Sequence, residues 1–266
     1  QAKLKDNMME LATKPERVND LPQKGLKEGP FPFKRNGKYY LTFPWAKDST
    51  EVLAYCMSDQ PLGPWKFMGV FMDESPTGCW TNHHSIVEYK GQWYIFYHHN
   101  DYSPEFDKNR SARIDTIGFN PDGTIIKVIP TLRGVGNSDA RTQIQIDRYN
   151  EIAPTASIAY LNEDNKFDGW KTLFKKSGAW VKYNRVEFGQ EPVKQVKFRV
   201  LAPKGAKLEV SIAGGKSIAT VNVPRSNNWE IVSAPVKKSP TGLQDLKITL
   251  KSGQAEVDWM IFDAKP

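Results

Sequence analysis

Residues 27–41 read KEGPFPFKRNGKYYL, and this stretch predicts a tight hairpin. The Gly-Pro pair at 29–30 breaks the chain, and Asn-Gly at 36–37 is a strong signal for a two-residue turn between antiparallel strands. Glu28 comes just before the break, so we expect its carboxyl group at the mouth of the hairpin among aromatic rings. Loss of hydration there would raise its pKa and let it donate a proton near neutral pH. The alternative is an ordinary strand-edge glutamate that faces solvent.

The same alternation of short strands and turns continues along the whole chain. Segments rich in aromatic and β-branched residues are separated by Gly, Pro, Asn and Asp, and no long helical periodicity interrupts them. The pattern therefore predicts an all-β protein. We expect strands at 38–43, 52–57, 84–89, 92–98, 180–183, 196–200, 207–212, 246–250 and 256–262.

The sequence predicts two domains with different β architectures. A turn followed by an aromatic strand occurs at 36–41 and again about 55 residues later, which suggests propeller blades, with two unrelated hairpins as the alternative. A small, polar stretch at 134–138 marks a boundary. Period-two patterning after it indicates a β-sandwich. We therefore expect one domain over residues 1–136 and a second over 141–266.

Composition places the chain among folded proteins. It has 266 residues, of which 39% are hydrophobic and 25% charged, and it contains no run of about 18 apolar residues that would predict a membrane span. Residues 1–140 hold 17 Lys and Arg against 17 Asp and Glu, whereas residues 141–266 hold 20 against 13, so the net charge of +7 falls in the second part. The lysines are scattered singly, which favours a solubilising surface over a nucleic-acid site.

The ends and the cysteines say little about compartment. The chain begins at Gln1 without a basic and then apolar leader, so we expect any signal peptide to be absent or already removed. Cys56 and Cys79 are too few for a disulfide framework, and their pairing stays open.

All four histidines lie between residues 83 and 99. If 90–91 is a two-residue turn, the numbers of opposed residues sum to 181, which pairs Ser85 with Phe96 and His83 with His98. Two neighbouring imidazoles could bind a metal or line a polar pocket. A zinc site would need a third ligand, and no Cys or His pattern supplies one. Histidines hydrogen-bonded at a strand end are the alternative.

Six motifs occur in order in the first part of the chain: EGP (28–30), GKYYL (37–41), LGPW (62–65), NHHSIV (82–87), RS (110–111) and FNPDGTI (119–125). Together they resemble glycoside hydrolase family 43, whose catalytic domain is a five-bladed β-propeller. In the second part, GAWVKY (178–183) and VDWMIF (257–262) make residues 141–266 resemble carbohydrate-binding module family 6, a β-sandwich of the jelly-roll type.

The resemblance implies an inverting, exo-acting arabinofuranosidase or β-xylosidase that acts on a plant cell-wall polysaccharide such as arabinoxylan. In this chemistry a carboxylic acid protonates the leaving oxygen while a carboxylate about 6.5–9.5 Å away activates water. Glu28 falls on the acid, His83 on a histidine associated with a calcium ion or water cluster, and Arg110 on an active-site arginine. Trp45 and Trp80 could stack on a sugar ring, with core packing as the alternative.

The chain also departs from the family 43 pattern. The family's base aspartate and a second, acid-tuning aspartate precede the acid by many residues, whereas only 27 residues precede Glu28 here. Asp6 and Asp20 do not stand in the expected contexts. We therefore expect the last blades of the propeller, inactive alone and associated with a missing N-terminal propeller segment or a partner chain. The alternative is a non-catalytic carbohydrate-binding or scaffold protein.

The family 6 segment departs from its pattern as well. Ser226 stands in place of a ligand-stacking Trp, Asp258 in place of an Asn, and Phe174 where a Tyr is common. Asp147 and Asp263 lie near positions that hold a structural calcium ion in the family, with ordinary surface acids as the alternative. The resemblance thus implies a calcium ion but no organic cofactor, and a polysaccharide partner rather than a membrane or nucleic acid. Such a substrate implies a secreted or periplasmic protein.

Overall fold

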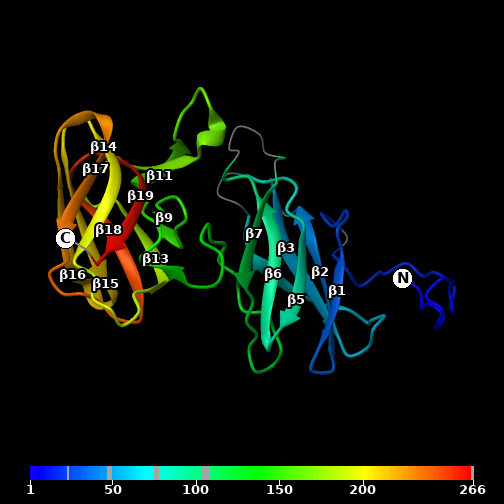
Figure 1. Ribbon diagram of the computed structural model, residues 1–266. Coiled ribbons are helices and arrows are strands. Elements are labelled where there is room, and N and C mark those ends of the chain that lie inside the picture. The colour runs from blue at the N-terminus through cyan, green and yellow to red at the C-terminus, as the bar shows by residue number, and fades with distance from the viewer. Residues whose placement is uncertain (23, 47–49, 75–77, 103–107, 109, 265–266) are drawn as a thin grey trace. The chain divides into compact units, whose positions relative to one another are not determined.

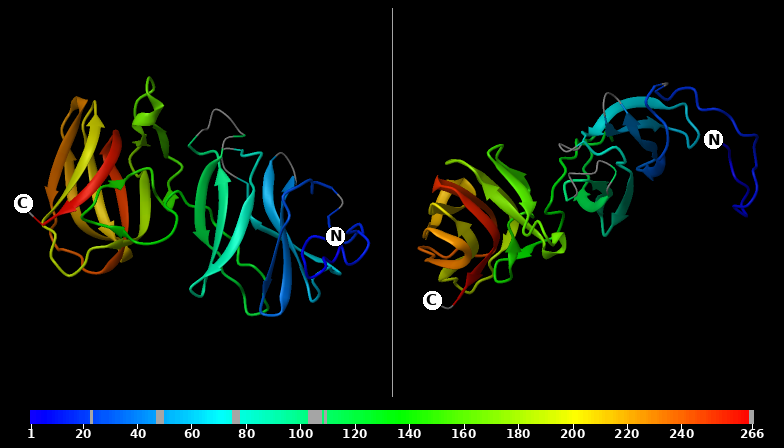
Figure 2. Two further views of the ribbon diagram at one scale, coloured as in Figure 1. Left: turned by 45° about the vertical axis from the view of Figure 1, so that its right-hand side comes forward. Right: turned by 90° about the horizontal axis from the view of Figure 1, so that it is seen from above.

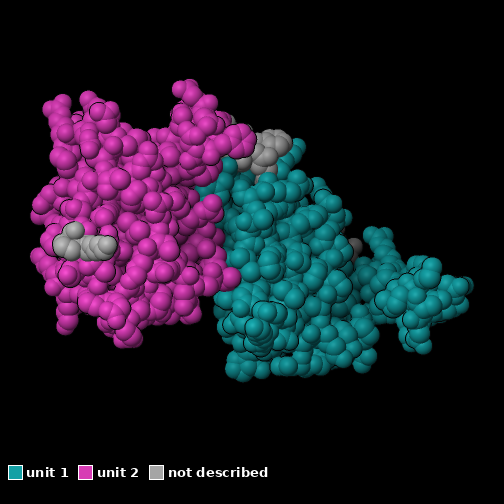
Figure 3. All heavy atoms as spheres, viewed as in Figure 1, with its two compact units in different colours: residues 1–130 teal, residues 131–266 magenta. Residues whose placement is uncertain are grey.

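The computed structural model describes residues 1–22, 24–46, 50–74, 78–102, 108 and 110–264. Strands dominate, so the predicted all-β class is confirmed. The chain divides into two compact units, residues 1–130 and 131–266, which Figure 3 colours separately. Within the described ranges, no helix has the length and apolarity needed to cross a membrane.

The first unit consists of two antiparallel sheets in which consecutive strands are neighbours (Figure 1). This up-and-down order is that of propeller blades, and two blades were predicted. The four-stranded sheet contains β1 (Phe31–Arg35), β2 (Lys38–Ala46), β3 (Glu51–Ser58) and β4 (Lys66–Met72), and the three-stranded sheet contains β5 (His84–Tyr89), β6 (Gln92–His99) and β7 (Ser111–Thr116).

Both predicted hairpin turns form and set the register of the strands. Asn36 and Gly37 have φ of 47° and 78°, and Lys90 and Gly91 have 51° and 78°. Two consecutive positive φ angles define a type I′ turn, whose twist matches that of the flanking strands. Ser85 therefore pairs with Phe96, as predicted.

The sheets of the first unit pack around an aromatic and aliphatic core. The Phe33 and Tyr40 rings stack with centroids 4.5 Å apart, and Leu53, Phe71 and Ile95 are almost completely buried. Every residue of β3 is buried, because this strand lies between β2 and β4 and has side chains packed on both faces. The consequence is that Glu51, the first residue of β3, is drawn inside the unit.

The second unit is a sandwich of two antiparallel sheets, which Figure 2 shows from two further directions. One sheet has the order β10-β13-β18-β15-β16, with β8 beside β13, and the other has the order β11-β12-β19-β14-β17, with β9 beside β19. The elements are β8 (Ser138–Asp139), β9 (Ile144–Gln145), β10 (Glu151–Ile152), β11 (Ala156–Tyr160), η1 (Lys166–Asp168), β12 (Trp170–Phe174), β13 (Trp180–Glu187), β14 (Gln195–Ala202), β15 (Ala206–Ile212), η2 (Ala213–Gly215), β16 (Lys216–Val223), β17 (Ser226–Pro235), β18 (Leu243–Gly253) and β19 (Ala255–Asp263).

Alternating side chains build the sandwich core. In β14, Val196, Phe198 and Val200 are fully buried while Lys197 and Arg199 between them are partly exposed. This is the period-two pattern expected of a strand with one buried face. The division between the units falls a few residues before the expected boundary at 134–138. Segment 131–136 is fastened to the sandwich, since the Arg133 amide donates a hydrogen bond to the Tyr149 carbonyl.

Candidate functional site

The up-and-down topology brings several predicted site residues to one end of each sheet of the first unit. The start of β1, the end of β2 and the start of β3 share one end of the first sheet, where Glu28, Trp45 and Glu51 lie. The corresponding end of the second sheet carries His83 and Arg110, directly before β5 and β7. A contact between Glu28 Oε1 and His83 Nε2, at 3.8 Å, joins the two ends.

Gly29 permits this contact. Its φ is +68°, and a Cβ atom at this position would lie 3.0 Å from the Pro44 ring and 3.2 Å from His83 Cε1. Only glycine combines this backbone conformation with so close an approach. The Glu28 side chain is 69% exposed, so the expectation of an acid buried among aromatic rings is wrong. Glu28 precedes the first residue of β1 and stands outside the hydrogen-bonded hairpin.

Glu51 is a second carboxyl group at this end, and the sequence reasoning missed it. The residue is 8% exposed, and the Asn82 amide donates a hydrogen bond to its carboxylate. Burial raises its pKa, the nearby Glu28 carboxylate adds to the rise, and His83 opposes it. No described residue gives Oε2 a hydrogen bond. The signal that could have found it is a charged residue opening the otherwise apolar run EVLAYCM at 51–57.

His83 and His98 are neighbours, as the register predicted. Their rings are perpendicular, with centroids 6.3 Å apart. His98 is 7% exposed, and its Nε2 has no hydrogen-bond partner among the described residues. Burial lowers its pKa to about 4, with the Arg110 guanidinium and His83 contributing. His98 is therefore a buried, neutral imidazole at pH 7 behind the exposed His83.

The other two histidines are also neutral and serve the packing of the unit. His84 Nε2 shares a hydrogen bond of 2.6 Å with Thr42 Oγ1, and burial lowers the pKa of His84 to about 3. Asn82 Nδ2 lies 3.3 Å from His99 Nε2, and burial lowers the pKa of His99 to about 3.

Arg110 and the two tryptophans differ in their exposure and in their contacts. Arg110 is exposed, and its Nη1 donates to the Lys108 carbonyl at 3.3 Å. Trp45 donates from Nε1 to the Lys24 carbonyl at 2.7 Å and packs edge-on against Phe67, so it takes part in the packing of the unit. Trp80 is 37% exposed. Sugar binding by Arg110, Trp45 and Trp80 stays a prediction.

The oxygen atoms beside His83 are of the kind that calcium takes as ligands. Glu51 Oε2 and Asn82 Oδ1 are buried without hydrogen-bond partners in the described part of the chain, and they fit a calcium ion in donor type. No three His, Cys, Asp or Glu residues of the described ranges gather closely enough to form a metal site on their own. Zinc, which requires such a set, therefore has no site among the residues described.

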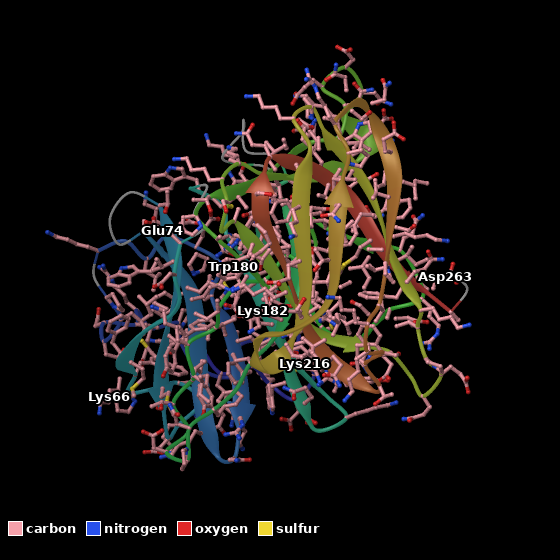
Figure 4. All side chains as sticks on the ribbon, turned by 90° about the vertical axis from the view of Figure 1, so that its left-hand side faces the viewer. Lys66, Glu74, Trp180, Lys182, Lys216 and Asp263 are labelled. Carbon is pink, nitrogen blue, oxygen red and sulfur yellow. The ribbon has the colours of Figure 1, made fainter. Side chains whose placement is uncertain are left out.

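Asp147 and Asp263 do not fit a shared calcium ion. The Ile146 amide donates a hydrogen bond to the Asp258 carbonyl, so Asp147 lies beside the middle of β19. Asp263, which Figure 4 labels, ends that strand. Five residues of strand separate these points by about 16 Å. Asp263 Oδ2 is also 2.9 Å from Lys197 Nζ, and Asp147 Oδ2 is 3.4 Å from Arg148 Nε. Protein cations thus face both carboxylates.

The three altered positions of the sandwich are all engaged within the protein. Phe174 is 1% exposed and belongs to the core. Asp258 is 6% exposed and accepts a hydrogen bond from Arg199, whose guanidinium lies 4.9 Å from the centre of the Trp229 ring. Ser226 Oγ accepts from the Asn228 amide at 3.0 Å. Asp258 and Ser226 are thus engaged by other protein groups, and the buried Phe174 side chain also borders a surface hollow lined by Leu173, Leu201 and Pro203.

Comparison with known protein families identifies both units of the chain. Residues 1–125 match the model of glycosyl hydrolases family 43, and residues 155–264 match carbohydrate binding module family 6. The order of the two predicted resemblances is confirmed. The chain is 36% identical over 140 residues to a xylosidase/arabinosidase of Bacteroides ovatus, which covers 48% of this chain and 41% of that protein. It is 42% identical over 94 residues to a β-xylosidase of Xylanibacter ruminicola, covering 35% of this chain and 28% of that protein.

The fold has a solved counterpart along almost the whole chain. The crystal structure of a family 43 arabinoxylan arabinofuranohydrolase from Bacillus subtilis, in complex with cellotetraose, covers 98% of this chain and 58% of its own, with a TM-score of 0.53. At 22% sequence identity this likeness shows the fold alone. The predicted partial propeller followed by a sandwich is therefore confirmed. The chain spans less than half the length of the two curated relatives.

Proposed function

Because a glycosyl hydrolase family 43 segment is followed here by a family 6 carbohydrate-binding module, we propose that this protein takes part in hydrolysing O-glycosidic bonds of xylan-type polysaccharides. The names of the relatives, a xylosidase/arabinosidase and a β-xylosidase, support an arabinofuranosidase or xylosidase type of activity. A polysaccharide substrate supports a secreted or periplasmic location.

The pairing of Glu28 with His83 is the observation that carries the proposal. Glu28 stands at the accessible end of the blades, 3.8 Å from an imidazole and on the family's acid motif. In the proposed reaction Glu28 donates a proton to the leaving oxygen of the scissile bond. Arg110 lies at the same end and is suited to hold sugar hydroxyls, because an exposed guanidinium donates hydrogen bonds.

An inverting mechanism needs a second carboxylate that activates water on the opposite face of the sugar. Glu51 is unsuited to that role, since it is buried and its unpartnered oxygen is closed to solvent. We propose that the base aspartate comes from polypeptide outside these two blades, either a further propeller segment or a partner chain. This chain spans only 41% and 28% of the lengths of the two curated relatives, which supports a base supplied by polypeptide outside it.

A calcium ion beside His83 belongs to the same proposal. Glu51 and Asn82 would hold it through oxygen atoms that lack other partners in the described chain. Such an ion would supply positive charge near the acid. Bound calcium would be detected by elemental analysis of the purified protein.

The experiment compares hydrolysis by this chain alone with hydrolysis by a form that contains the remaining blades. The substrates are 4-nitrophenyl α-L-arabinofuranoside, 4-nitrophenyl β-D-xyloside and arabinoxylan. We expect no turnover by the chain alone and turnover by the longer form. In the longer form, Glu28→Gln should abolish cleavage of arabinoxylan, whose leaving group needs protonation, while binding is largely kept. Glu88→Gln, at an exposed position of β5 in the same unit, is the matched control and should retain full activity.

Equal turnover by the Glu28→Gln variant would reject the assignment of the acid. The second candidate function is a non-catalytic carbohydrate-binding or scaffold protein. The 69% exposure of the Glu28 side chain favours this alternative for the isolated chain. A longer form that binds arabinoxylan but hydrolyses none of the three substrates would establish it.

A further inference from the structure

We propose that the hairpin between β11 and β12 is an aromatic finger, residues 160–170, that contacts the polysaccharide through Phe167. The inference rests on the proposed carbohydrate-binding role and names the surface that would perform it. Figures 1 and 2 show this hairpin projecting from the body of the sandwich. Phe167 at its tip is 99% exposed, more than any other large hydrophobic side chain among the described residues.

A contact surface of this kind would add to the sandwich a site away from the positions that depart from the family pattern, which are largely engaged by other protein groups. Phe174 lies in the core, and Asp258 is held by Arg199. Ser226 is bonded within its own turn. A sugar ring that approached these positions would have to displace a buried ion pair, which costs several kcal/mol in general. A ligand surface elsewhere on the unit therefore faces no such competition.

A single exposed apolar side chain is common on protein surfaces, but this one is held in a fixed position. The Phe167 amide donates to Asn165 Oδ1 at 3.3 Å, and the Asp168 amide donates to the Asn165 carbonyl at 3.1 Å. The Asp168 carboxylate in turn accepts from the side-chain amides of Asn162 and Asn165. The tip is thus ordered before any ligand arrives, which lowers the entropic cost of binding.

The root of the finger is aromatic as well. Tyr160 and Trp170 are directly opposed on β11 and β12, and their ring centroids lie 4.3 Å apart. The Lys166 ammonium lies 4.7 Å from the centre of the Tyr160 ring. Below the tip, the hairpin is closed by a hydrogen bond of 2.9 Å from the Leu161 amide to the Gly169 carbonyl. Two closely packed rings, tilted by 33°, therefore form the base of the hairpin that carries Phe167.

These features fit the apolar face of a neutral β-linked glycan. One face of a pyranose ring presents C–H groups, which pack on an aromatic ring while the hydroxyl groups at the edge stay hydrated. Both faces of the Phe167 ring are open to such contact, since the side chain is almost fully exposed. Neutral arabinoxylan is the ligand class that the proposed function supplies.

The test measures binding of the full chain to soluble arabinoxylan by affinity electrophoresis and calorimetry, with pullulan as the unrelated polymer. Phe167→Ala should weaken binding about tenfold, the order expected for loss of one aromatic contact. Phe167→Trp should restore it, and the emission of the new tryptophan should shift to shorter wavelength when arabinoxylan is added. Ile231→Ala is the matched control, because Ile231 is 64% exposed on β17, at the opposite edge of the same sheet.

The outcomes separate the finger from the wider proposal. Unchanged affinity of Phe167→Ala, in a wild-type chain that binds arabinoxylan, overturns the finger and leaves carbohydrate binding intact. Equal weakening by Ile231→Ala also overturns it. A wild-type chain that binds no arabinoxylan rejects both the finger and the carbohydrate-binding part of the proposed function, while hydrolysis through Glu28 is decided by its own assay. Thermal unfolding of Phe167→Ala should match the wild type, since the side chain buries almost no surface.

Discussion

Lowering the pH from 8 to 5 should selectively unfold the first unit. His84, His98 and His99 are buried there as neutral imidazoles, and burial lowers their pKa values to about 3, 4 and 3. In the unfolded chain a histidine has a pKa of about 6.5 and takes up a proton below it. Between pH 6.5 and about 4 the unfolded state therefore binds more protons, so stability is lost as the pH falls through this window.

The size of the effect follows from the same values. At pH 5 each histidine of the unfolded chain lies 1.5 units below its pKa, which favours unfolding by about 2 kcal/mol. Three histidines together give about 6 kcal/mol, comparable with the whole stability of a typical domain. Glu51 acts in the opposite sense, because burial raises its pKa and the protonated form favoured at low pH suits its buried site. The net loss is therefore somewhat smaller.

Hydrogen exchange followed by mass spectrometry at a series of pH values provides the assay, since its peptides report each unit separately. The second unit contains no histidine and serves as the internal control. Protection of the sheets β1–β4 and β5–β7 should collapse near pH 5 while β13–β19 stay protected. In His84→Gln, the pH dependence of the first unit should fall by about a third. Equal protection of both units at pH 5 and pH 8, at matched intrinsic exchange rates, would refute the reasoning.

Three further predictions concern the stability of each unit. Gly29→Ala should destabilise the first unit by about 1–3 kcal/mol and displace His83, because the new Cβ atom meets Pro44 and His83 at a positive φ. Urea unfolding measures the loss of stability, and the imidazole NMR signals of His83 report its displacement. Arg199→Met should lower the free energy of unfolding of the second unit by about 2 kcal/mol, because Asp258 is left buried without its cation. Wild-type stability of this variant in chemical unfolding would show that the Arg199–Asp258 pair does not stabilise the unit. Addition of calcium, or its removal with a chelator, should leave the unfolding midpoint of the second unit unchanged, since Lys197 pairs with Asp263 and Arg148 with Asp147. A midpoint raised by several degrees with calcium would show that the ion replaces these contacts.

The strands and their register could be predicted because their signals are local. Alternating aromatic and β-branched residues and the two Gly-containing turns are each contained in a few consecutive residues. Strand β5 has the predicted bounds, and Ser85 pairs with Phe96 as the turn at 90–91 requires. Strands β16 and β17 were missed, because their sequences KSIATVNV and SNNWEIVSAP are polar and alternate weakly. Their position at the edge of each sheet leaves one side without a neighbouring strand.

The candidate site was less predictable, because its character arises where separate sheets meet. Glu28 and His83 could be placed at strand ends from the motifs, but the exposure of Glu28 could not. The burial of Glu51 depends on the packing of β3 from both faces, which no window of sequence around that residue contains. Likewise, the pairing of Asp258 with Arg199 joins residues from different strands, 59 positions apart.

The attachment of residues 131–152 to the sandwich determines where that module can be excised. Strand β8 pairs with β13, β9 with β19 and β10 with β13, and the buried Tyr183 hydroxyl donates to the Ile146 carbonyl. A fragment that began where the family match begins, at residue 155, would lose all three strands and the Ile146 carbonyl that accepts a hydrogen bond from Tyr183. Recombinant modules, fusions and transplants should therefore start at Thr131.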